Sequence, residues 1–307
     1  MPAIWTHMLF CEDIADTIRT VPNSVFANDT YMKLGSQGTN PLYFRHFWLG
    51  KRLPFKQCDL ELQTNGTALI IDMIQEAKKM DDEAKAYIFG FITHFILLKH
   101  ICPYMRYGAE NITNSTDKMD IAIDTIMMEK FHNLKAWTSR VYKEIDVGFS
   151  INKDICTLLH RLFADHFPSF TRITDKKFQM AYREMKLTLR LLADPSGWKN
   201  KLFKHFFTPF SHELLDQGKD YLNLEHHAWH HPTTGKTSTD SFLDLYNRSR
   251  STALEILSLV MHYWDQSNNA LPTVLIQLFQ QLTDIPADQS KKWTRIHGRS
   301  DGKIQLI

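Results

Sequence analysis

The segment from Tyr87 to Leu98 constrains the fold of this chain most, because its residues are apolar on nearly every side of a helix. Asp81, Asp82 and Glu83 come shortly before it. Negative charge stabilises the first turn of a helix, and a carboxylate there can accept hydrogen bonds from free amides. We therefore expect a helix from about Asp82 to Ile101 that lies buried at the centre of the protein.

Apolar residues recur at helical spacing through most of the remaining chain, whereas the alternation typical of strands is mostly confined to Lys51–Asn65. The sequence therefore predicts an all-α fold, with a single multi-helix domain at residues 1–285. Further helices are expected at about Pro2–Ile18, Ser24–Leu34, Thr67–Met80, Thr116–Leu134, Lys153–His166, Asp175–Leu192, Ser238–Asp265 and Pro272–Leu282. Long connections are expected at Lys51–Phe55, Tyr107–Asn114 and Gly218–Thr237, and a basic, mobile tail at residues 286–307.

Length and composition indicate one core and no strongly charged partner. No linker rich in glycine, serine or proline divides the 307 residues, of which 43% are apolar. The formal net charge of +2 supplies no strong field for attracting polyanions, so we expect no nucleic-acid partner. Charge gives no indication of a protein partner.

The N-terminal segment and the cysteines predict a protein of the cytoplasm. Before Glu12 there is no basic leader and no uninterrupted apolar stretch, unlike a secretory signal. The four cysteines form no Cys-x-x-Cys motif and fit free thiols in a reducing compartment. The longest apolar run, Ile88–Leu98, is too short to span a bilayer, so no transmembrane segment is expected.

Two histidine motifs and a glycine-containing turn carry a resemblance to a known family. They are Trp5-Thr6-His7, Gly35-Ser36-Gln37-Gly38-Thr39-Asn40-Pro41 and, inside the central helix, Gly90-Phe91-Ile92-Thr93-His94. Together these strings resemble the zinc-dependent phospholipase C family in its intracellular bacterial branch, clearly over residues 1–135 and more loosely to residue 265. The resemblance implies the helical fold shared by phospholipase C and the single-strand zinc nucleases.

The resemblance also implies where metal would bind. In that family a zinc cluster is held by histidines and carboxylates, including an aspartate in the glycine turn and a helical His-x-x-x-Asp pair. By this analogy His7 and His94 face one cavity, and Asp120 stands in for a family glutamate. The implied metal ligands in this chain are therefore His7, His94 and Asp120.

Most other ligand positions of the family carry unsuitable atoms here. Leu98, four residues after His94, has no lone pair, and the amide of Asn40 is a poor zinc ligand. A family histidine falls near Thr64 or Asn65, and another is replaced by Cys102, a residue type that more often packs in a core. The candidate pocket then comprises His7, Asn40, Asn65, His94, Leu98, Cys102, Asp120 and Asp124.

Asp120 and Asp124 lie four residues apart, so their charges would repel on one helix face. If both faced inward, a cation or a proton would have to lie beside them. The interpretation that we favour is a solvated acidic face near a helix N-terminus.

A second histidine cluster occupies His226–His231. In a helix, His227 and His231 would share a face at a spacing suited to zinc or nickel. Pro232 and the polar residues after it favour a loop instead, in which Trp229 packs and the histidines bond to carbonyl groups. Both alternatives remain open at this point.

Two hypotheses for the function follow. The favoured one is a phospholipase C-like helical protein with a degenerate metal site, which acts as a non-catalytic binding or scaffold protein. The alternative is a zinc-dependent phosphodiesterase or phospholipase C-type hydrolase with a rearranged ligand set. The cofactor is accordingly none or zinc, and the resemblance implies a phospholipid head group or a small phosphodiester as ligand. No motif of another enzyme class is present, and no catalytic residue is assigned.

Overall fold

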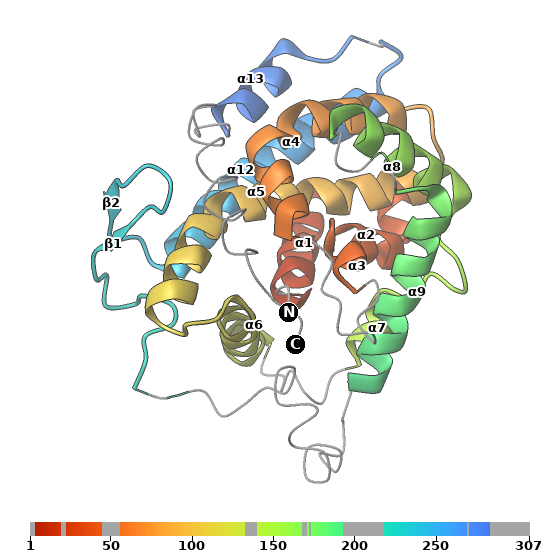
Figure 1. Ribbon diagram of the computed structural model, residues 1–307. Coiled ribbons are helices and arrows are strands. Elements are labelled where there is room, and N and C mark those ends of the chain that lie inside the picture. Colours follow the sequence, from red (N-terminus) through yellow and green to blue (C-terminus); the bar gives the residue numbers. More distant parts are fainter. Residues whose placement is uncertain are drawn as a thin grey trace.

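The computed structural model describes residues 4–19, 23–44, 56–132, 140–167, 171, 173–192, 216, 218–268 and 270–282. These residues form one mostly helical domain with a single short hairpin (Figure 1). The elements are α1 Ile4–Ile18, η1 Ser24–Ala27, α2 Asp29–Gly35, α3 Asn40–Tyr43, α4 Lys56–Ala77, α5 Asp82–Asn111, α6 Thr116–His132, α7 Val141–Glu144, α8 Lys153–His166, α9 Asp175–Leu192, β1 Trp229–His230, β2 Thr237–Ser238, α12 Phe242–Asp265 and α13 Thr273–Gln281. The predicted all-α character is confirmed, while the tail expected at residues 286–307 lies outside the described residues.

Helix α5 runs through the middle of the domain, and α1, α2, α4, α6 and α12 all pack against it (Figure 1). Every residue from Ala86 to Leu97 is buried. At its start, Oδ1 of Asp81 accepts a hydrogen bond from the backbone N–H of Ala84 at 2.9 Å. The prediction of a buried central helix with an acidic start is therefore confirmed.

By length and composition alone, α5 is also the one helix among the described residues that could cross a membrane. Its most apolar window is 72% buried inside the protein, and burial on all sides accounts for that composition. The expectation of no transmembrane segment stays a prediction.

Helices α2 and α5 cross in direct backbone contact. A Cβ atom on Gly35 would lie within 3.0 Å of the carbonyl oxygen of Tyr87, and one on Gly90 within 3.0 Å of the carbonyl oxygen of Met32. Any side chain at either position would separate the helices. This close approach places the turn that follows Gly35 against the buried face of α5.

The sequence placed the end of α5 too early and expected a connection at Tyr107–Asn114. The helix instead continues past Pro103 to Asn111 (Figure 1). Proline inside a helix costs about 3 kcal/mol, since it removes one backbone hydrogen bond and its ring crowds the preceding turn. Burial of Tyr104 and Met105 beyond it offsets this cost.

The strand-like alternation expected at Lys51–Asn65 is wrong where the structure describes it, because α4 begins at Lys56. Leu62 is fully buried and continues, at helical spacing, the buried stripe that runs from Leu69 to Ala77. Leu60 and Leu62 alternate with polar residues over too few positions to distinguish a strand from a helix. Packing against α5 selects the helix.

The helix expected at Ser24–Leu34 is divided into η1 and α2 at Asn28, and the short helices α3 and α7 were not predicted. The helix expected at Thr67–Met80 begins earlier, at Lys56, and the one expected at Asp82–Ile101 ends later, at Asn111. The remaining expected helices agree with the structure to within four residues at each end, and Lys153–His166 and Asp175–Leu192 agree at both ends. The long connection expected at Gly218–Thr237 is confirmed and contains strand β1.

Candidate functional site

His7 from α1 and His94 from α5 lie side by side in the core. Their ring centroids are 4.2 Å apart, with an angle of 32° between the ring planes. Both side chains are buried, with exposed fractions of 4% and 2%. The histidines of two distant motifs thus form one buried pair.

The turn after α2 fixes the orientation of the His94 ring. Nδ1 of His94 donates a hydrogen bond to the carbonyl oxygen of Ser36 at 3.0 Å. Gly38 has a φ of 53°, and a Cβ atom there would lie 2.5 Å from Nε2 of the same ring. Glycine is therefore required at position 38 both for its backbone conformation and for the space that the ring occupies.

Two nitrogen atoms of this histidine pair are left without a partner. Nε2 of His94 and Nδ1 of His7 are buried and make no hydrogen bond among the described residues. Because His94 carries its proton on Nδ1, its Nε2 presents a lone pair. A buried polar atom without a partner costs about 1–3 kcal/mol, so this pair is maintained against a local penalty.

Both imidazoles are neutral at pH 7. Burial lowers the pKa of His94 to about 4. Burial also lowers the pKa of His7 well below its ordinary value, and the neighbouring His94 lowers it further. Neutral imidazole is the form that binds zinc, but two such ligands are fewer than the three of a catalytic site.

The carboxylate of Asp124 is buried, and both of its oxygens accept hydrogen bonds from the first turn of α1. Its Oδ1 accepts hydrogen bonds from the backbone N–H and the hydroxyl of Thr6, at 2.9 and 2.6 Å, and its Oδ2 accepts one from the N–H of Trp5 at 3.1 Å. Asp124 of α6 therefore caps amides in the first turn of α1. The expected solvated acidic face is wrong for Asp124, whereas Asp120 is partly exposed.

Removal of the Asp124 carboxylate is expected to lower the free energy of unfolding by about 2 kcal/mol, because Asp124→Ala leaves buried amides of α1 without an acceptor. Urea unfolding would measure this effect, with Glu129→Ala as an exposed control on the same helix. In a double-mutant cycle with Thr6→Val, the two changes should not be additive. Equal stability of the Asp124 and Glu129 variants would contradict this role.

The remaining predicted positions do not complete a metal site. Asn40 is buried, and its amide donates to Oε1 of Gln37 at 3.4 Å. Leu98 packs against the core, Cys102 is partly exposed on α5, and Asn65 is exposed on α4. Among the described residues, no group of three or more histidine, cysteine, aspartate or glutamate side chains could hold a metal ion.

The cluster His226–His231 lies in a loop and a short hairpin, so its helical alternative is wrong. Strands β1 and β2 pair antiparallel, with His230 opposite Thr237. The spacing that would pair His227 with His231 is therefore absent. His227 is exposed, and its Nε2 lies 3.6 Å from Oε2 of Glu225.

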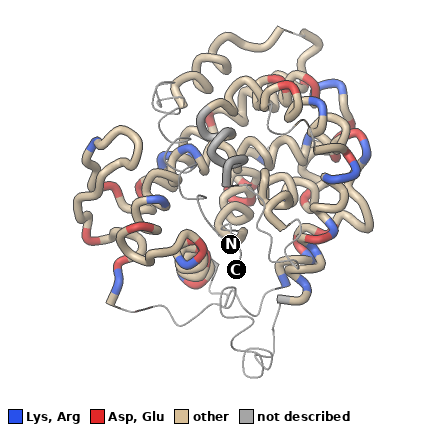
Figure 2. Tube along the Cα trace, in the orientation of Figure 1, with Lys and Arg blue, Asp and Glu red and all other residues tan. Residues whose placement is uncertain are grey.

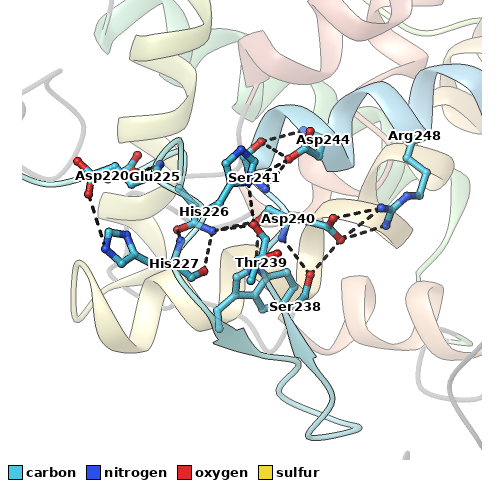
Figure 3. Close-up of polar contacts among 12 residues, drawn as sticks. Asp220, Glu225, His226, His227, Ser238, Thr239, Asp240, Ser241, Asp244 and Arg248 are labelled. Atoms are coloured by element: carbon cyan, nitrogen blue, oxygen red, sulfur yellow. Dashed lines mark hydrogen bonds and ion pairs between the residues drawn. The ribbon is translucent and has the colours of Figure 1, made fainter.

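Polar contacts tie this loop to the start of α12 (Figure 3). Nδ1 of His226 donates to the carbonyl oxygen of Thr239 at 3.0 Å. Ser241 and Asp244 form a capping box at the first turn of α12, with hydrogen bonds of 2.8 and 3.1 Å. The buried Trp229 donates from Nε1 to a backbone carbonyl, so the loop alternative with a packed tryptophan is confirmed.

A cavity of about 430 Å³ lies beside the hairpin, along the connection Gly218–Thr237. Its basic side chains are Lys99, Arg106, Lys236 and Arg248. Figure 2 shows basic residues on the hairpin and on the helices beside it. Lys99 and Arg106 are seven residues apart, so they lie on the same face of α5. That spacing and the length of the connection Gly218–Thr237 were the signals available in the sequence.

Comparison of this chain with protein-family models, with curated proteins and with solved structures gives no significant match.

Proposed function

We propose that this chain is a phospholipase C-like helical protein that works in the cytoplasm as a non-catalytic binding protein, without a bound zinc cluster. The observation that supports this proposal best is the donor set around His7 and His94. It consists of two imidazoles. Asp124, the only buried carboxylate among the described residues, already accepts hydrogen bonds from the amides of Trp5 and Thr6 and from the hydroxyl of Thr6.

The described residues do not fit a zinc cluster of the family type. A catalytic zinc requires three protein ligands and an open position for water. Here Leu98 has no donor atom, and Asn40 offers a neutral amide that is bonded to Gln37.

One observation favours the alternative, a zinc-dependent hydrolase of the phospholipase C type with rearranged ligands. Nε2 of His94 and Nδ1 of His7 are buried without partners, and a metal ion would satisfy a lone pair on either ring. A third ligand would then have to come from residues that now bond elsewhere, at a further cost in stability.

Metal analysis separates the two candidates. Protein purified without a histidine tag and without chelator is expected to contain far less than one zinc per chain. Its thermal midpoint should not change with chelator, since a metal at 100 times its dissociation constant would add about 2.7 kcal/mol of stability. Elemental analysis and thermal unfolding provide these two measurements.

Variants identify where any bound zinc is held. His226→Ala with His227→Ala and His230→Ala removes the exposed histidines of the loop and hairpin as a source of adventitious binding. About one zinc per chain that persists in this variant and is lost in His94→Asn would overturn the non-catalytic proposal.

A further inference from the structure

The outer side of α9 exposes an apolar stripe. Helix α9 runs along the edge of the domain (Figure 1) and buries Tyr182 and Met185 on the side that packs against its neighbours. Met180, Leu187 and Leu191 are exposed instead. At 3.6 residues per turn these three positions fall within about 40° of one another around the helix axis. They therefore form one stripe along the outside of the domain.

Phe149, from the connection between α7 and α8, extends this stripe. Its side chain is 78% exposed, the largest exposed fraction among the large apolar residues that the structure describes. Nε of Arg183 in α9 donates a hydrogen bond to the carbonyl oxygen of Phe149 at 3.0 Å. The guanidinium carbon of Arg183 also lies 3.9 Å from the centroid of the Phe149 ring, so the ring is held beside α9 by a cation–π contact.

The backbone on both sides of Phe149 is anchored to α9. The side-chain amide of Gln179 accepts from the N–H of Ile151 at 3.0 Å and donates to its carbonyl oxygen at 2.7 Å. The hydroxyl of Tyr182 donates to the carbonyl oxygen of Gly148 at 2.9 Å. Phe149 could not move into the core without breaking these contacts, so its exposure is fixed by the fold.

These apolar residues form a patch and are not scattered over the surface. Six large apolar side chains are exposed in the part of the chain that the structure describes, and four of them belong to α9 or contact it. Isolated exposed apolar residues need no explanation, whereas a contiguous group of them marks an interaction site. We call this group the α9 patch: Phe149, Met180, Leu187 and Leu191.

Basic side chains flank the patch on one side. Helix α9 carries five basic residues against two acidic ones, Asp175 and Glu184. Lys176, Arg183 and Arg190 lie within about 80° of Met180 in the same direction around the axis. Lys176 and Arg190 are exposed and form no ion pair with any residue that the structure describes.

The carboxylates near α9 lie away from this basic flank. Asp175 accepts hydrogen bonds from Thr157 and from Nδ1 of His160, both in α8, at 2.9 and 2.7 Å. Asp146 pairs with Lys186 at 2.7 Å. Glu184 lies on the other side of the apolar stripe. The patch therefore combines protruding apolar groups with positive charge along one edge.

We propose that the α9 patch rests on the surface of a membrane that contains anionic phospholipid. Phenylalanine and leucine side chains insert at the boundary between headgroups and acyl chains, while lysine and arginine pair with anionic headgroups. A projecting ring on a convex helix face suits a deformable lipid layer better than a rigid protein surface. Contact with a second copy through α9 would bring like charges together.

This inference goes beyond the proposed binding function and does not depend on it. No residue of the α9 patch belongs to the His7–His94 pair, so membrane contact requires no metal ion. The contact is also peripheral, because residues of one outer face reach only the interfacial layer of a bilayer.

Sedimentation of the full chain with vesicles tests the proposal. Vesicles of phosphatidylcholine and phosphatidylglycerol in equal parts are expected to bind the protein at least about tenfold more tightly than vesicles of phosphatidylcholine alone. The affinity should fall as the salt concentration rises. Absence of binding to the anionic vesicles, or equal binding to both compositions, would overturn the proposal.

Apolar variants locate the contact. Phe149→Ser with Leu187→Gln is expected to weaken binding to the anionic vesicles at least about tenfold, since both side chains lose their insertion into the interface. Leu224→Gln with Val274→Ser removes two exposed apolar side chains outside the patch and should leave the affinity unchanged. Circular dichroism and the thermal midpoint check that both double variants fold. The assignment fails if the patch variant binds like the control.

Charge variants separate a local contact from general attraction. Lys176→Gln with Arg190→Gln is expected to weaken binding to the anionic vesicles about tenfold. Lys118→Gln with Lys130→Gln, at two exposed positions of α6, makes the same change in net charge and should weaken it less than about twofold. An equal loss in both variants would show that net charge alone attracts the protein, and would overturn the proposal.

Two further outcomes keep this inference distinct from the alternatives. Analytical ultracentrifugation is expected to show the same mass with and without Leu187→Gln. A dimer that this variant dissociates, together with no vesicle binding, would assign the patch to a second copy. Zinc bound through His94 with unchanged vesicle binding would overturn the non-catalytic proposal alone.

Discussion

Replacing Gly90 by alanine is expected to lower the free energy of unfolding by about 3 kcal/mol or more, the largest effect of any single substitution considered for this protein. The added Cβ atom would meet the carbonyl oxygen of Met32 and the amide nitrogen of Ser36, which are backbone atoms of a neighbouring segment. Backbone atoms cannot rotate away as a side chain can. Helices α2 and α5 would have to separate along the contact that positions His94.

Gly108→Ala provides a matched control on the same helix. There the new Cβ atom would meet only the flexible end of Met119, at 2.5 Å from Cε. Because alanine favours helix by about 1 kcal/mol over glycine, the net change should lie within about 1 kcal/mol of zero. Urea unfolding of both variants measures the difference. Similar stabilities for Gly90→Ala and Gly108→Ala would disprove the tight crossing.

Acidification from pH 7 to pH 4 is expected to destabilise the protein through the buried histidine pair. In the unfolded chain a histidine side chain titrates near pH 6.5, whereas burial in the folded protein holds the pKa of His94 at about 4. Between these values the unfolded state binds the extra proton, so the stability present above pH 6.5 is lost as the pH falls. The shift of His94 corresponds to roughly 3 kcal/mol.

Protonation of Asp124 changes the free energy of unfolding in the opposite direction. Burial raises its pKa from 3.8 to about 6, against the hydrogen bonds from Thr6 and Trp5. The folded state therefore binds its proton first, and stability from this group increases as the pH falls from 6 towards 4. This contribution roughly cancels that of His94. The lowered pKa of His7 then determines the sign of the net change in stability, and the protein is expected to be less stable in acid.

Urea unfolding between pH 7 and pH 4.5 measures this dependence. His94→Asn retains a donor for the carbonyl oxygen of Ser36 but does not titrate, so the loss of stability in acid should become smaller. His227→Asn, at an exposed position, should follow the unmodified protein. A pH dependence that is the same in both variants would contradict the assignment to the buried pair.

Local features of the sequence determined much of the helical content. The apolar stretch Tyr87–Leu98 and the acidic residues before it predicted a capped, buried central helix, and both properties are present. These features act within a few turns of one helix, so periodicity and capping chemistry suffice to recognise them. The extent of α4 and the continuation of α5 past Pro103 were missed, because burial against other helices outweighs local preference there.

From the sequence alone, a resemblance grouped His7 and His94 with the glycine-containing turn Gly35–Pro41, and the residue types showed that Asn40 offers a neutral amide and Leu98 no lone pair. Only the tertiary structure decided that the two rings lie side by side, that Asp124 caps α1, and that basic residues of α5, the hairpin and α12 line one cavity. Hydrogen bonds reach about 3 Å, and interactions between exposed charges are largely screened beyond about 10 Å. Their partners are therefore set by how helices pack, which residue spacing along the chain does not specify.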